Sequence, residues 1–261
     1  MFRKASFIPV ALVALGGAGA ASAADQGQWV TSFMAGSEFL ESGSFNPHAT
    51  SDIADLGTID PSLAGISGQA HIDQLQFRDA FRVGPSFSLE TGYMAESNVE
   101  PFVRLSYSQL DGRNQEVGIL DSPSLDTPVP IRANIGDMNT WALNLGTRYF
   151  LTDSGAARTY LAGYVGADRT DALHARIHVA GMPETASEDI LPQTTRFDAG
   201  VEGGVAWQVS NNTDLSLSLG AQYLDARSEN TNAFAPVGVE DVRFTDPRWS
   251  FPVNFGVNFK F

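Results

Sequence analysis

The sequence predicts an all-β protein: one eight-stranded, antiparallel, up-and-down transmembrane β-barrel with four long extracellular loops and short periplasmic turns. Three observations predict this fold. The chain begins with an export signal, apolar residues occupy every second position of eight segments, and the connections between these segments alternate in length.

The first 24 residues are typical of a cleaved signal peptide. Arg3 and Lys4 give a positive start, residues 7–15 are apolar, and Ala21-Ser22-Ala23 fits the small-residue cleavage pattern. The apolar run is too short to cross a bilayer as a helix. We therefore expect residues 25–261 to form the mature protein as a single barrel domain.

Composition excludes several classes of protein. The chain has no cysteine, so an exported form has neither a disulfide framework nor thiol chemistry. The formal charge of −14 argues against nucleic acid as a partner, because phosphate binding needs clustered Lys and Arg. We expect no cofactor.

The C-terminal segment gives the clearest strand pattern. Its apolar positions are Trp249, Phe251, Val253, Phe255, Val257, Phe259 and Phe261, and polar or small residues fill the positions between them. Seven apolar positions at a period of two would be scattered around a helix but fall on one face of a strand.

Seven further segments are predicted as strands from the same alternation. They are residues 29–41, 79–95, 101–110, 140–152, 159–170, 195–209 and 214–227. For residues 159–170 the sequence does not decide which face points outward, since Leu161 and Val165 compete with Tyr160 and Tyr164 for that face.

The connections fall into two classes. Short gaps are 96–100, 153–158 and 210–213, and long gaps are 42–78, 111–139, 171–194 and 228–247. Strict alternation of the two is typical of an up-and-down barrel in an outer membrane. The long gaps are acidic and show no sustained period, so we expect loops there.

The second face of the strands is mostly small and carries a few charges. The strands of a water-soluble barrel also alternate apolar and polar residues, but the outer face of such a barrel is usually dense in Lys and Glu. Small residues suit the narrow interior of an eight-stranded barrel. The inward charges are predicted to be Arg82, Arg104, Arg148, Arg196, Glu38, Glu90, Asp198 and Glu202. Because buried charges must be paired, we expect a lumen ion-pair network centred on Glu90, Arg104, Arg148 and Glu202.

Aromatic residues are predicted to form two belts at the lipid–water interfaces. The belt at the turn end contains Trp29, Tyr93, Phe102, Tyr149, Trp207 and Phe259. The belt at the loop end contains Phe39, Phe81, Tyr107, Trp141, Phe197, Tyr223 and Trp249.

On these features the sequence resembles the small outer-membrane barrels, the OmpA-like and OmpX-like eight-stranded proteins, without the peptidoglycan-binding domain of OmpA. The most specific element is the last strand, whose Phe255, Val257, Phe259 and Phe261 resemble the signal read by the barrel-assembly machinery. The resemblance implies Sec export, periplasmic chaperones and insertion into the bacterial outer membrane.

No catalytic or metal motif stands out. The histidines are His48, His71, His174 and His178, and neither of the last two has a serine within two residues, as a lipid-modifying barrel enzyme would. His174 and His178 are four apart, which pairs metal ligands on a helix but not on a strand. Acidic loop residues such as Asp52, Asp55, Asp60 and Asp73 suggest at most weak calcium binding.

The sequence thus favours a monomeric, non-enzymatic barrel with a largely plugged lumen. Its expected partners are outer-membrane lipids, lipopolysaccharide and host or cell-surface ligands bound through the acidic loops. Two alternatives stay open: a narrow pore for small solutes, and a lipid-modifying outer-membrane enzyme.

Overall fold

A computed structural model describes residues 26–40, 43–46, 48–152, 156–180, 184–225, 228–231, 242–245 and 248–261. The expected signal peptide, residues 1–24, lies outside the described residues. Among the helices that the structure describes, none is long and apolar enough to cross a bilayer.

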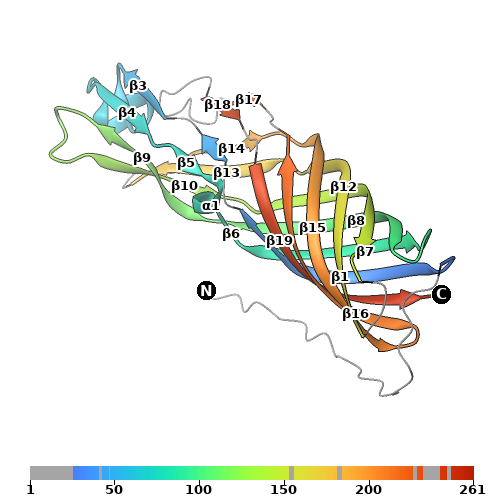
Figure 1. Cartoon of the computed structure of the whole chain (residues 1–261). Helices are drawn as coiled ribbons and strands as arrows, with labels where there is room; N and C mark the ends of the chain where they lie inside the picture. The colour runs from blue at the N-terminus through green and yellow to red at the C-terminus, as the bar shows by residue number, and fades with distance from the viewer. Residues whose placement is uncertain are drawn as a thin grey trace.

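Eight long antiparallel strands close into a barrel (Figure 1). Around the wall they are β1 (Trp29–Leu40), β7 (Gly84–Tyr93), β8 (Val99–Gly112), β11 (Met138–Phe150), β12 (Ala157–Thr170), β15 (Thr194–Ser210), β16 (Thr213–Leu224) and β19 (Arg248–Lys260). Pairing of β1 with β19 joins the two ends of the chain, and pairing of β8 with β11 completes the ring. The predicted fold class is confirmed.

The outer surface of the wall is apolar. Large side chains at alternate positions face outward and are 42–65% exposed, among them Phe33, Leu89, Leu105, Leu145, Val201, Leu219 and Phe255. The ambiguous strand is settled in β12, where Leu161 and Val165 face outward and both tyrosines are buried. A closed barrel with an apolar outside is one of the few structures that satisfies its backbone in lipid, and it places the chain in the bacterial outer membrane.

Aromatic pairs mark both ends of the wall. Trp29 and Tyr93 lie 5.2 Å apart between ring centroids at the turn end. Tyr223 and Trp249 lie 5.3 Å apart at the loop end. Two residues expected in these belts are buried instead, since Phe102 is 4% exposed in the lumen and Phe81 is 2% exposed under the extracellular part.

One seam of the wall is interrupted. The β16–β19 ladder pairs Leu219 with Val253 and Gln222 with Ser250, but the two rungs between them are missing. Pro252 stands at this break and has no backbone N–H to donate.

The long connections are largely not loops. A second, six-stranded sheet stands beyond one end of the barrel (Figure 1), in the order β14-β13-β10-β9-β4-β3. Its strands are β3 (Ala49–Ile53), β4 (Gly68–Ile72), β9 (Asn114–Asp121), β10 (Val129–Ile135), β13 (Leu173–Val179) and β14 (Glu184–Leu191). The expectation of loops without sustained structure is therefore wrong for these segments.

The second sheet is built on extensions of the barrel strands and has its own core. Gly112 lies where β8 passes into β9, and a Cβ there would approach the carbonyl oxygens of Ile135 and Gly136. One face of the sheet is packed with apolar residues that include Ile72, Leu120, Ile131, Leu173 and Ile177, each at most 1% exposed. This sheet is a folded unit.

Short elements fill the remaining described segments. They are β2 (Ser44–Asn46), η1 (Leu56–Thr58), η2 (Pro61–Leu63), β5 (Leu75–Gln76), α1 (Phe77–Ala80), β6 (Phe81–Arg82), β17 (Ser228–Thr231) and β18 (Val242–Thr245). The strand expected over 79–95 thus begins only at Gly84, because α1 and β6 occupy its first residues.

Candidate functional site

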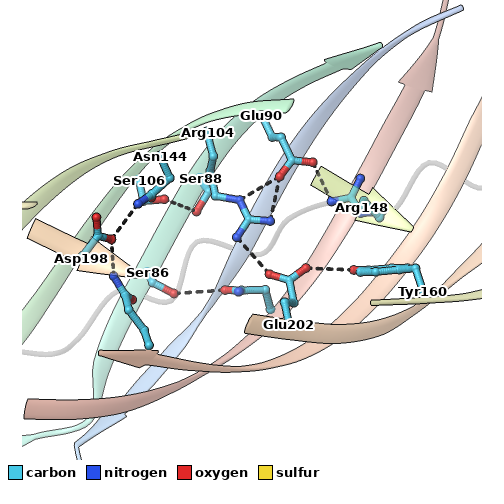
Figure 2. Close-up of polar contacts among 12 residues, drawn as sticks. Ser86, Ser88, Glu90, Arg104, Ser106, Asn144, Arg148, Tyr160, Asp198 and Glu202 are labelled. Carbon is cyan, nitrogen blue, oxygen red and sulfur yellow. Dashed lines mark hydrogen bonds and ion pairs between the residues drawn. The ribbon is translucent and has the colours of Figure 1, made fainter. Parts of the chain in front are cut away.

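Two buried arginines bridge carboxylates across the middle of the lumen (Figure 2). Arg104 on β8 lies 2.7 Å from Glu90 on β7 and 2.9 Å from Glu202 on β15. Arg148 on β11 lies 2.7 Å from the other carboxylate oxygen of Glu90. The structure therefore brings together the four residues expected at the centre of the network.

Three residues that the sequence analysis did not place in this network complete it. Glu100 lies 3.0 Å from Arg148 and is buried, although the sequence placed it in a turn. The Tyr160 hydroxyl donates to Glu202 at 3.1 Å, and its ring lies 4.7 Å from the Arg148 guanidinium carbon. Phe102 packs under both arginines, at 5.0 and 5.3 Å. Aromatic faces therefore cover the guanidinium groups.

A second polar layer lies closer to the second sheet. The carboxylate of Asp198 accepts from Asn144 at 2.6 Å and from Gln222 at 2.8 Å. Arg196 lies 3.6 Å from Asp168, a partner that the sequence did not predict. Glu38 is 8% exposed and lines the cavity beside this layer.

Cavities lie on both sides of the arginines. One, of about 60 Å³, is bordered by Arg104 and lined with hydroxyls and amides such as Ser88, Ser106 and Asn254. The other, of about 20 Å³, is bordered by Arg148 and reaches the Lys260–Asp214 ion pair, whose atoms lie 2.8 Å apart, near the turn end. The ion-pair network stands between the two spaces.

Arg82 is not part of the lumen. It was expected to point inward, but it is exposed and the neighbouring Phe81 is buried. The reversal occurs because Val83 interrupts the strand between β6 and β7, so that the inside–outside alternation of the wall does not continue into β6.

The mouth toward the second sheet is packed. Arg248 at the start of β19 donates to the Met138 sulfur at 3.3 Å, across the barrel from β11. The Phe77 ring of α1 lies 5.5 Å from the Arg248 guanidinium carbon, and both residues are at most 1% exposed. Arg248 therefore links β19 to β11 across the mouth, and Phe77 packs against Arg248 there.

On the exposed face of the second sheet, three polar side chains contact one another across β13 and β14. His174 Nδ1 lies 3.2 Å from an Asp189 carboxylate oxygen, and His174 Nε2 lies 2.9 Å from the Ser187 hydroxyl. The side chains of His174 and Asp189 are 49% and 61% exposed. Sequence analysis missed this group because the serine is 13 residues from the histidine and is brought close only by strand pairing.

The acidic turns of the second sheet are held by backbone hydrogen bonds. The N–H groups of Gly57 and Gly65 each donate to the Asp55 carboxylate at 2.8 Å, which lowers the pKa of Asp55. The backbone N–H and the hydroxyl of Ser62 lower the pKa of Asp60 in the same way. In the described part of the chain, no three His, Asp or Glu side chains are grouped to hold a metal ion.

Comparison with known proteins gives fold likeness alone. No protein-family model matches the chain, and no curated protein matches it in sequence. Neisserial surface protein A aligns with 90% of this chain and 98% of its own at 15% identity and a TM-score of 0.43. The chain has the fold of the small outer-membrane β-barrels.

Other solved barrels align over a similar length. Ail, the attachment invasion locus protein of Yersinia pestis, covers 90% of this chain and 99% of its own at 13% identity and a TM-score of 0.39. The outer membrane protease OmpT from Escherichia coli covers 90% and 97% at 9% identity and a TM-score of 0.40. At these identities the alignments indicate no function for this chain, because one fold can carry many functions.

Proposed function

We propose that the barrel itself is a non-enzymatic outer-membrane anchor with a plugged lumen, which holds a folded sheet at the cell surface for interactions there. The observation that carries the proposal is the second sheet, whose buried core continues into the packed mouth of the barrel through Phe77 and Met138. Loops that only connected strands would not need a core of their own.

Several features support a plugged lumen. An eight-stranded barrel is just wide enough for its interior side chains to fill it. Here Arg104 reaches from β8 to Glu202 on β15, with two strands between them in the ring, so that an ion pair crosses the bore. Opening a continuous water path requires separating buried charges that are expensive to leave unpaired. This proposal includes Arg196, Asp198 and Glu38 as further lumen residues.

Planar-bilayer recording tests the plug. The wild-type barrel is expected to give no stable openings, whereas Arg148→Glu, which places a third acid beside Glu90 and Glu100, is expected to open the lumen or to destabilise the barrel. Stable wild-type openings whose conductance follows salt concentration would instead favour the narrow pore. Unchanged conductance and unchanged thermal stability in Arg148→Glu would contradict the network as a plug.

The exposed surface of the second sheet and its neighbouring turns is acidic. Exposed acids there are Asp52, Asp55, Asp73, Asp79, Asp111, Glu116, Asp121, Asp126, Asp137 and Asp189. Exposed bases are Arg78, Arg82, Arg132, Arg169 and Arg176. An acidic excess attracts cationic groups on a host or neighbouring cell, and divalent cations that bridge to lipopolysaccharide phosphates.

Cell-surface assays test this role. Cells that carry the protein are expected to adsorb more strongly to immobilised polylysine than cells without it, and 0.5 M salt is expected to remove the difference. Permeability to a bulky dye after chelation of divalent cations measures envelope integrity. Equal adsorption and equal permeability in the two strains would refute the surface role.

The lipid-modifying enzyme stays as an alternative with a direct readout. Mass spectrometry of lipid A from cells with and without the protein should give identical spectra if the barrel wall is not catalytic.

For assembly, we propose that residues 1–24 direct export and that Phe255, Val257, Phe259 and Phe261 are read during insertion, as in the barrels that the sequence resembles.

A further inference from the structure

We propose that Ser187, His174 and Asp189 form a hydrolytic site for carboxylic esters on the extracellular face of the second sheet. The three side chains share one face, because the alternate residues Ala175 and Ile177 of β13 and Ile190 of β14 are buried on the other. The proposal relies on the surface role only for the location of the site outside the membrane.

The hydrogen bonds at the two ring nitrogens of His174 are arranged as a serine hydrolase requires. Asp189 is the register partner of His174 and lies at Nδ1, whereas Ser187 lies at Nε2, on the opposite side of the ring. With the carboxylate accepting from Nδ1–H, the neutral imidazole keeps its lone pair on Nε2. That lone pair faces the serine hydroxyl, as a general base for a nucleophile requires.

The proposed reaction needs only these side chains, the ester and one water molecule. Ser187 Oγ attacks the ester carbonyl carbon while its proton passes to His174 Nε2. The tetrahedral intermediate expels the alkoxide, which takes that proton and leaves as the alcohol. Water then attacks the acyl-serine, His174 takes a proton from the water and returns it to Ser187, and the carboxylic acid is released.

Arg176 is placed to stabilise the negative charge that develops on the carbonyl oxygen. It is the register partner of Ser187 and is exposed on the same face. Facing residues of an antiparallel pair have Cβ atoms about 4.5–5.5 Å apart, within reach of a long side chain. Ser187 and Arg176 are both exposed, so a small ester can reach them from the solvent side of the sheet.

The exposure of the group sets the size of the effects. A positioned general base contributes about 10²–10⁴-fold, and we expect His174→Gln to lose about 100-fold because the site is open to water. Asp189 is a positioning residue that is 61% exposed. Its Asn variant is expected to lose only about 10-fold, far less than the loss of about 10⁴-fold at a buried triad aspartate.

The test uses the full-length protein folded in lipid vesicles. A fluorophosphonate probe should label the wild-type chain at Ser187, located by peptide mass spectrometry, and 4-nitrophenyl butyrate should be hydrolysed above the vesicle background. Ser187→Ala should abolish both signals, and Arg176→Gln should slow hydrolysis while leaving the probe site unchanged.

The same sheet offers a matched control. His71 lies 3.2 Å from the Thr50 hydroxyl, but the structure shows no carboxylate hydrogen-bonded to His71 in the part of the sheet that it describes. Thr50→Ala and His71→Gln should therefore leave labelling and hydrolysis unchanged. No labelling of the wild-type chain, labelling at another serine, or hydrolysis that survives Ser187→Ala would overturn the proposal. None of these results bears on conductance or adsorption, so the surface role would stand or fall separately.

Discussion

Replacing Arg148 by Met tests whether the lumen ion pairs hold the barrel together. Arg148 contacts Glu90 at 2.7 Å and Glu100 at 3.0 Å, and its side chain is 6% exposed. Met keeps much of the side-chain volume but leaves the two carboxylates with one arginine fewer. Glu90 keeps Arg104 as a partner at 2.7 Å, whereas Glu100 loses the ion pair described above.

The expected loss is about 3–5 kcal/mol in the free energy of unfolding, which is the usual cost of removing one partner from a buried ion pair. Urea unfolding in lipid vesicles, followed by tryptophan fluorescence and by gel mobility without heating, measures this loss. Adding Glu100→Gln to Arg148→Met should recover part of it, because the double variant no longer buries the unpaired carboxylate.

Arg78→Met is the matched control. Arg78 is 57% exposed and lies 4.0 Å from Asp79, so its replacement should change the free energy by less than about 0.5 kcal/mol. If Arg148→Met costs less than about 1 kcal/mol, or the double variant is no more stable than the single one, the carboxylates are not held by the arginine and the reasoning fails.

Three further changes probe other parts of the molecule. Phe77→Ala empties a fully buried site and should cost about 3–5 kcal/mol, seen as faster trypsin cleavage of the second sheet while barrel mobility on gels is kept. Gly146→Val should cost about 1–3 kcal/mol in urea, because a Cβ there lies 2.4 Å from the Phe102 ring, whereas Gly163→Val meets nothing within 4 Å and serves as its control. Phe261→Ala should reduce outer-membrane insertion in cell fractionation but not the urea midpoint of refolded protein, since this side chain is 74% exposed.

The wall was predictable because lipid on one side and a narrow lumen on the other impose a period of two on every strand. The alternation of residues did not predict side-chain direction where the contrast between lipid and lumen ends. Tyr160 and Tyr164 suit either an interface or a polar interior, and the lumen groups that they contact lie on other strands. Arg82 lies before Gly84, the first residue of the wall strand β7, where alternation no longer indicates which side chains face the lumen.

The second sheet has a weaker pattern of alternating apolar residues in the sequence than the barrel wall. Ile131, Ala133 and Ile135 alternate as a strand should, and so do Leu173, Ala175 and Ile177. Each run is short and lies between polar residues, and one partner of each is remote in sequence, as in the pairing of β10 with β13. The contacts of His174 depend on the register of one hairpin, including a shift between Leu173 and His174. A local search for a neighbouring serine could not find them.

The two residue pairs missing between β16 and β19 make this seam of the barrel wall weaker than a continuous one. Separating these strands breaks fewer backbone hydrogen bonds than separating β1 from β19, whose register is continuous from Val30 to Leu40. Hydrogen bonds dominate the cost of parting strands where no water replaces them. Thermal fluctuations of this seam should therefore start beside Pro252, and the amides flanking it should exchange with deuterium before those of the β1–β19 seam.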